Sequence, residues 1–265
     1  MAAPRAEPAE FPWWLAILAT TAAWLYYEIW ANDLYAQAMQ TLSQGIGITA
    51  LVTVIAYFGA CIMGLLLALA GMSRWVVLRQ AARLYVEIVR GVPIIVLLLY
   101  IAFVIAPALV VALNALLGGL GLETIRSRDF PLLARAVIAL TVAYSAFLAE
   151  IFRAGLQSVD RGQIEAAMSL GLNGWQRFRL VVFPQALRTM LPPLGNDFVA
   201  MVKDSSLVSV LGVSDITQLG KVTAAGNFRY FETYNIVALM YLTMTISLSL
   251  LLRQLEKRMQ GGAGR

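Results

Sequence analysis

The chain has 265 residues, of which 60% are hydrophobic and 13% are charged, and its mean hydropathy is +0.75. Soluble domains have about 45–50% apolar and about 25% charged residues, so this composition excludes an ordinary soluble enzyme and indicates an integral membrane protein. The chain has no histidine, which argues against histidine-based catalysis and histidine-ligated metal sites. Its net charge is +5, but the basic residues are distributed as in a membrane protein rather than as in a nucleic-acid-binding protein.

Apolar runs along the chain predict six membrane-spanning helices, because a helix needs about 20 apolar residues to cross a bilayer. The runs cover residues 12–31, 48–72, 92–113, 131–152, 187–213 and 234–252. The first run has a competing interpretation as a cleaved signal peptide, but tryptophan and tyrosine side chains gather near both of its ends. Such residues anchor helices at membrane interfaces, so we expect a retained first span.

Charged residues cluster between the second and third runs. Arg79, Arg83 and Arg90 recur at spacings that place them on one side of a helix, with Glu87 among them. We expect a cytoplasmic, lipid-facing amphipathic helix that ends before Pro93.

The second run itself contains Gly59 and Gly64, small residues that permit close helix packing. At the end of the fourth run, Glu150 and Arg153 are spaced to form an ion pair on one helix face.

Residues 160–184 form a polar stretch between two apolar runs, and their sequence predicts two short capped helices. Asp160 with Gln163 and Asn173 with Gln176 each fit a capping box, in which the side chains satisfy unpaired backbone groups at a helix start. Gly171 supplies a C-terminal stop between the two helices. A proline, Pro184, limits the second helix or kinks its continuation.

The fifth run is unusually polar and is the candidate substrate path. Its candidate residues are Asn196, Asp197, Lys203, Asp204 and Ser206. Ionisable residues inside a membrane usually face a partner, a cavity or a pathway, and a zwitterionic amino acid needs both an acidic and a basic or amide partner. The seven-residue spacing places Asn196 with Lys203 on one face and Asp197 with Asp204 on another. Two alternatives stay open: Lys203 neutralises an aspartate, or it contacts a neighbouring subunit.

Basic residues outside the predicted spans set the orientation. Fourteen lie on the side of the N-terminus, the 72–93 loop, the 153–188 loop and the C-terminus, and four lie on the other side. Because cytoplasmic loops carry the excess of Lys and Arg, both termini and the polar stretch are predicted to be cytoplasmic.

The polar stretch resembles the EAA loop of permeases of bacterial ABC importers. Glu165, Ala166, Ala167, Gly171 and Pro184 stand at the spacing of that pattern, whereas Val181 and Phe183 replace its Ile and Leu. Arg90-Gly91-Val92-Pro93 and the segment around Asn196–Lys221 are similar to the polar amino acid uptake branch, the histidine/glutamine/arginine-type permeases.

The resemblance implies an all-α polytopic protein with a five-helix type I importer core, residues 39–258, preceded by a tail and extra span, 1–38, and followed by a tail, 259–265. It also implies that this chain works as one subunit of an inner-membrane assembly. The expected partners are a dimer of ABC ATP-binding subunits, a second permease (itself or a sister subunit), and a periplasmic or lipid-anchored solute-binding protein. Glu165, Ala166, Ala167, Gly171 and Pro184 are implied to form the ATPase-coupling loop, and the substrate is a polar amino acid.

No phosphate-binding GxxxxGK[ST] loop occurs in this sequence, so ATP and Mg²⁺ are expected on a separate chain, and no cofactor or enzymatic activity is expected here. An autonomous secondary transporter or channel, with Asp197, Lys203 and Asp204 as an ion relay, is the alternative. A membrane enzyme is disfavoured, since Ser205-Ser206 has no histidine to activate it.

Overall fold

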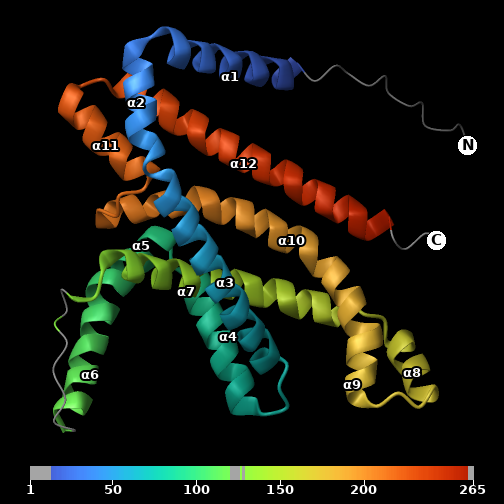
Figure 1. Ribbon diagram of the computed structural model, residues 1–265. Helices are drawn as coiled ribbons and strands as arrows, with labels where there is room; N and C mark the ends of the chain where they lie inside the picture. The colour runs from blue at the N-terminus through green and yellow to red at the C-terminus, as the bar shows by residue number, and fades with distance from the viewer. Residues whose placement is uncertain (1–12, 120–125, 127–128, 262–265) are drawn as a thin grey trace, which may run out of the picture.

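The computed structural model describes residues 13–119, 126 and 129–261, and the regular structure within them is helical (Figure 1). The α-helices are α1 (Trp13–Ala31), α2 (Asp33–Ser43), α3 (Ile46–Gly71), α4 (Val76–Gly91), α5 (Ile94–Tyr100), α6 (Ala106–Gly119), α7 (Leu132–Gln157), α8 (Arg161–Ser169), α9 (Gly174–Arg177), α10 (Phe183–Asp204), α11 (Ile216–Asn227) and α12 (Tyr230–Gly261). Two π-helical turns, η1 (Ile101–Ile105) and η3 (Phe178–Val182), and one 3₁₀ segment, η4 (Ser205–Leu211), join some of them.

Four helical segments of the described chain are long and apolar enough to cross a membrane. They are Asp33–Gly71, Ile94–Ala115, Leu132–Gln157 and Tyr230–Arg258, and they contain most of the second, third, fourth and sixth predicted spans. The first predicted span is helical from Trp13, and Pro12 lies outside the described residues. The fifth is α10 followed by η4, a helix whose polar residues and prolines reduce its mean hydropathy.

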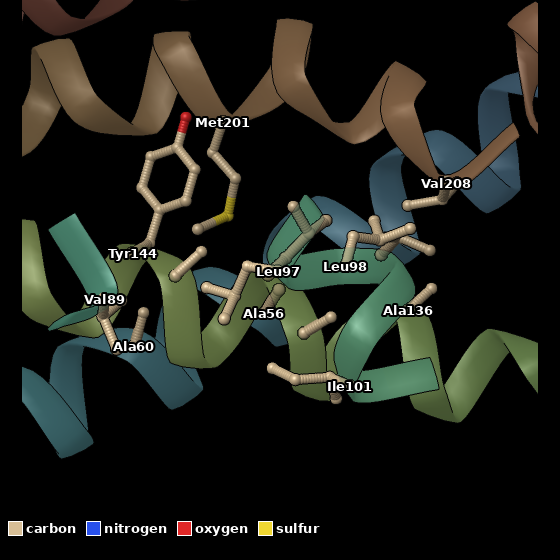
Figure 2. Packing of buried hydrophobic residues seen from close by; sticks show 14 of the residues in the cluster. Ala56, Ala60, Val89, Leu97, Leu98, Ile101, Ala136, Tyr144, Met201 and Val208 are labelled. Carbon is tan, nitrogen blue, oxygen red and sulfur yellow. The ribbon is translucent and has the colours of Figure 1, made fainter. Parts of the chain in front are cut away.

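The core lies between α3 and α7, which cross at close range. Small side chains make this approach possible: a Cβ added to Gly59 would lie 3.0 Å from Thr141, and one added to Gly64 would lie 3.0 Å from the Ser145 carbonyl. Membrane helices pack through such small residues because the lipid offers no hydrophobic driving force between them. Buried alanines of α3 and α7 extend this contact, and side chains of α5 and α10 pack on it to form one hydrophobic cluster. Figure 2 shows Ala56, Ala60, Leu97 and Met201 in this cluster.

The predicted amphipathic segment is α4, which ends at Gly91, and Pro93 precedes α5 as predicted. Helix α4 packs on α3 and α7 through Ala82, Val86 and Val89.

Each π-helical turn stands just before a proline. At η1, the Ala106 N–H donates to the Ile101 carbonyl, one residue further back than in an α-helix, and Pro107 has no N–H. The Ala102 carbonyl therefore loses its usual donor. Arg135 of α7, which is 7% exposed, donates from Nη1 to this carbonyl at 2.9 Å. A buried guanidinium thus satisfies the backbone group that the proline leaves unpaired.

Helices α10 and α12 lie side by side, and α7 packs against the other side of α10 (Figure 1). Beyond the common end of α7 and α10, the short helices α8 and α9 project away from the rest of the bundle (Figure 1). This arrangement presents the polar stretch of the sequence at one end of the molecule.

Candidate functional site

The projecting loop begins with a capped helix. The Gly162 N–H donates to Asp160 Oδ1 at 2.6 Å, so Asp160 caps α8 as predicted. The predicted capping box is not formed, because Gln163 contacts Asp160 only through its backbone N–H, which donates to the Asp160 carbonyl at 3.2 Å. The start of α8 is therefore fixed by the carboxylate of Asp160.

Gly171 ends α8 in a Schellman motif. Its φ is +75°, in the left-handed region that glycine adopts without a steric penalty. The Gly171 N–H donates to the Met168 carbonyl at 2.9 Å, and the Leu172 N–H donates to the Ala167 carbonyl at 3.2 Å. These two bonds are the signature of the motif, and they turn the chain back toward α9.

The two sides of α8 differ in exposure. Ala167 is 3% exposed and faces the protein, whereas Glu165 and Ala166 are exposed. Two apolar side chains on the same helix and turn also face outward, with Met168 49% and Leu170 80% exposed. The outer side of α8 therefore combines one carboxylate, one small residue and apolar surface.

The second predicted helix is not a separate element. Asn173 and Gln176 form the predicted capping box, with the Gln176 N–H donating to Asn173 Oδ1 at 2.9 Å and the Asn173 N–H donating to Gln176 Oε1 at 3.0 Å. However, α9 continues through η3 into α10. The Phe183 N–H donates to the Phe178 carbonyl, so the wider turn accommodates Pro184 without ending the helix. From Gly174 onward, the predicted coupling loop is thus continuous with α10.

The polar residues of α10 lie on two faces. On the first face, Tyr144 of α7, which is 4% exposed, donates its hydroxyl to Asp204 Oδ2 at 2.7 Å. In Figure 2 the Tyr144 hydroxyl points from α7 toward α10 beside Met201. Asp197 lies seven residues before Asp204 on this side of α10, in the neighbourhood of Tyr144 and of Tyr57 of α3. This face therefore presents two carboxylates and two phenols toward α3 and α7.

The second face is turned toward α12. Asn196 lines a cavity of about 130 Å³ with Glu256 of α12, and Lys203 lines a groove of about 560 Å³ with Arg253 of α12 and residues of α1. The predicted pairing of Asn196 with Lys203 on one face agrees with these positions.

The structure does not bring Lys203 to the two aspartates. Within the described part of the chain, Lys203 has no ion pair, so it does not neutralise an aspartate here. Ser206 is half-buried in η4, directly after Asp204 and Ser205.

The sequence did not point to Tyr57 and Tyr144 as partners of α10. The Tyr57 hydroxyl donates to the Leu194 carbonyl at 2.7 Å, and its ring lies 4.8 Å from that of Phe198. The sequence did contain a signal for these contacts: both tyrosines stand inside apolar runs, and the hydroxyl of a buried tyrosine usually forms a hydrogen bond.

A buried carboxylate outside the predicted spans was also missed. Asp215 is fully buried before α11, where it caps the helix through the Gln218 N–H at 2.8 Å and accepts a bond from the Tyr241 hydroxyl at 3.1 Å. Burial raises the pKa of Asp215 above its usual value, although the hydrogen bonds from Gln218, Thr217 and Tyr241 oppose this shift. The residue ties α11 to α12 at one end of the bundle.

Comparison with known families decides what this arrangement is. The profile of the family described as "Binding-protein-dependent transport system inner membrane component" matches residues 60–261. The chain belongs to this family. It is a permease subunit of an ABC importer, as the spacing around Glu165 and Gly171 predicted.

Several curated proteins are similar to this permease over most of its length. It is 38% identical to the probable amino-acid permease protein YxeN of Bacillus subtilis, over 84% of this chain and 92% of that protein. It is 37% identical to the glutamine transport system permease protein GlnP of Escherichia coli, over 84% of this chain and 94% of that protein. It is 34% identical to the L-cystine transport system permease protein TcyL of Bacillus subtilis, over 83% of this chain and 87% of that protein.

Solved structures confirm the all-α type I importer fold. The permease matches a chain of the "Crystal structure of an amino acid ABC transporter with histidines" with a TM-score of 0.70 and 37% identity, over 84% of this chain and 96% of that one. An inward-facing structure of the MetNI methionine ABC transporter has a TM-score of 0.64 at 20% identity, over 83% of this chain and 97% of that one. This second likeness concerns the fold alone.

Proposed function

We propose that this permease takes up a polar amino acid and that α8 transmits the force of ATP hydrolysis from a separate ATP-binding subunit. The observation that carries this proposal is the outer side of α8, where Glu165 and Ala166 are exposed on a projecting helix that is fixed at both ends. Exposed Met168 and Leu170 beside them supply apolar contact area for a protein partner. Ala166 permits close backbone approach, and Glu165 offers a carboxylate to a basic or hydrogen-bonding group of the partner.

The route from α8 to the spans consists of one tight turn and a continuous helix. Gly171 turns the chain from α8 into α9, and α9 continues through η3 into α10, with Pro184 in the first turn of α10. A displacement of α8 would therefore pass through the short turn 170–173 and then along continuous helix. Ala167 packs α8 inward and supports the same transmission. Closure of an ATPase dimer would then rock the spans between two states, as in other rigid-body transitions.

The orientation follows from the distribution of basic residues. Fourteen lie on the side that carries both termini and the α7–α10 loop, which makes this side cytoplasmic in a bacterial inner membrane. The α8 helix is then accessible to a cytoplasmic ATPase. We also propose the domain division into residues 1–38 with a retained span, 39–258 as the permease core, and 259–265 as a tail.

The substrate path runs along α10. Asp197 and Asp204 lie on the face toward α3 and α7 and supply carboxylates for the ammonium group of an amino acid. Asn196, Lys203 and Ser206 complete the candidate path, and Lys203 on the other face is available to a second permease, itself or a sister subunit. A periplasmic or lipid-anchored solute-binding protein delivers the substrate. The relatives named for glutamine and cystine transport support a polar amino acid as the class.

Uptake into vesicles tests the function. The permease is reconstituted with its ATP-binding subunit and solute-binding protein, and amino acid uptake is measured with ATP and without an ion gradient. ATP-dependent uptake is expected. Uptake that requires a gradient and ignores ATP would instead support the autonomous transporter, in which Asp197, Lys203 and Asp204 relay an ion.

A further inference from the structure

A cavity of about 360 Å³ lies among α3, α4 and α7, away from the polar faces of α10. Its walls are small or aliphatic side chains of the last turns of α3 and of the facing parts of α4 and α7, together with four charged side chains. The charged residues are Arg83, Glu87, Glu150 and Arg153. The volume falls in the range of about 300–1,000 Å³ that small-molecule sites occupy.

The four charges are arranged as one acid and one base on each of two helices. Arg153 Nη2 lies 2.6 Å from Glu150 Oε2 on α7, and both side chains remain partly exposed, at 41% and 37%. Arg83 and Glu87 stand one helical turn apart on α4, and within the described residues neither forms an ion pair. The α4 pair therefore lines the cavity from exposed positions, without an ion pair of its own among the described residues.

This balance of charge selects the kind of ligand. Two guanidinium groups and two carboxylates give the cavity no net charge, so a free anion or cation gains little there. A molecule that carries an ammonium and an anionic group close together satisfies both signs at once. The cavity also adjoins the C-terminal end of α3 at Gly71, where the partial negative charge of the helix favours an ammonium group.

We propose that this cavity is a second ligand site, which binds the zwitterionic end of a free amino acid on the cytoplasmic side of the permease. This assignment of sides and substrate rests on the proposed function, since the 72–93 loop and the end of α7 are cytoplasmic in that orientation. Arg83 and Arg153 hold the carboxylate, and Glu87 and Glu150 hold the ammonium group. Because α7 ends at Gln157 and α8 begins at Arg161, an occupant here clamps α4 to the helix that leads into the coupling loop. Accumulated amino acid thereby slows further uptake.

Two kinds of variant test the site without touching α10. The double variant Arg83→Gln and Glu87→Gln removes both free charges of α4 from exposed positions. Gly71→Leu places an aliphatic side chain at a residue that lines the cavity, and its Cβ meets no atom within 4 Å. Gly91→Leu is the matched control, because its Cβ also meets nothing within 4 Å and Gly91 does not line the cavity.

The experiment uses the full permease–ATPase complex in nanodiscs and radiolabelled L-glutamine and L-arginine as probes. We expect the double variant and Gly71→Leu to weaken one component of binding by about tenfold or more, while Gly91→Leu binds as the wild type does. In vesicles preloaded with the probe, uptake by the wild type slows, and uptake by the two cavity variants does not. Equal binding and equal slowing in all four proteins would overturn the proposal.

The same zwitterionic chemistry is present in the headgroup of phosphatidylethanolamine. Nanodiscs of phosphatidylglycerol alone are therefore compared with nanodiscs that contain phosphatidylethanolamine. Competition by phosphatidylethanolamine that disappears in the double variant supports the zwitterion site and makes the lipid a source of its ligand. If the complex binds a probe in this cavity but never transports with ATP, the proposed function fails and the site does not.

Discussion

Replacement of Gly171 by alanine tests whether the shape of the α8 turn matters for coupling. Gly171 has a φ of +75°, and a Cβ at this position meets no atom within 4 Å, so the cost of alanine comes from the backbone alone. A non-glycine L-residue in the left-handed region destabilises the turn by about 1–2 kcal/mol. This lowers the ratio of molecules with an ordered turn to molecules with a frayed one about 5–30-fold. Asparagine adopts this region more readily, so Gly171→Asn costs less.

The assay compares ATP-dependent uptake and ATP hydrolysis in the same proteoliposomes. We expect Gly171→Ala to reduce the amount transported per ATP hydrolysed, and Gly171→Asn to retain most of it. Gly174→Ala is the matched control, because Gly174 lies in the same loop, its Cβ also meets nothing within 4 Å, and its φ is not positive. If Gly171→Ala and Gly174→Ala both couple as well as the wild type does, the Schellman turn has no role in transmission.

Four further changes probe other parts of the permease. Glu165→Arg reverses the exposed charge of α8 and should leave the protein inserted while it uncouples hydrolysis from uptake; normal uptake would remove the docking role. Tyr144→Phe deletes the donor to Asp204 and should lower stability by about 1.5–3 kcal/mol, measured as a lower Tm of the purified complex. Lys203→Met should change uptake or selectivity more than assembly, and loss of assembly with normal transport by the remaining complexes would assign Lys203 to the subunit interface. Asp215→Asn removes a carboxyl whose pKa is raised in the fold, so wild-type stability should fall relative to this variant as pH rises from about 4; parallel melting curves across pH would contradict this.

Local patterns in the sequence were sufficient for much of this fold. Hydropathy located the second, third, fourth and sixth predicted spans, because lipid requires long apolar helices. The first and fifth predicted spans are helical but are not among the described segments that are long and apolar enough to cross a membrane. Side chains that cap a helix act within a few residues of it, so Asp160, Asn173 and Gly171 were correctly assigned from their neighbours alone.

Contacts between distant segments were not predictable in the same way. The bond from Tyr144 to Asp204 joins residues 60 positions apart, and nothing local to either marks the other. The sequence also left open whether Pro184 limits the second helix or kinks its continuation, because the rule for proline takes no account of a wider turn that can absorb it.

The wide turn at η3 has a consequence for how the two ends of this long helix are set relative to one another. A π-helical turn contains one residue more than an α-helical turn, and one residue corresponds to about 100° of rotation around the helix axis. A single inserted residue between Phe178 and Val182 therefore sets the direction of α9 relative to α10. It also sets the position of α8 around the α10 axis. Deleting one residue there would rotate the tip around the α10 axis, whereas the contacts of α10 with α7 and α12 belong to the helix beyond this turn.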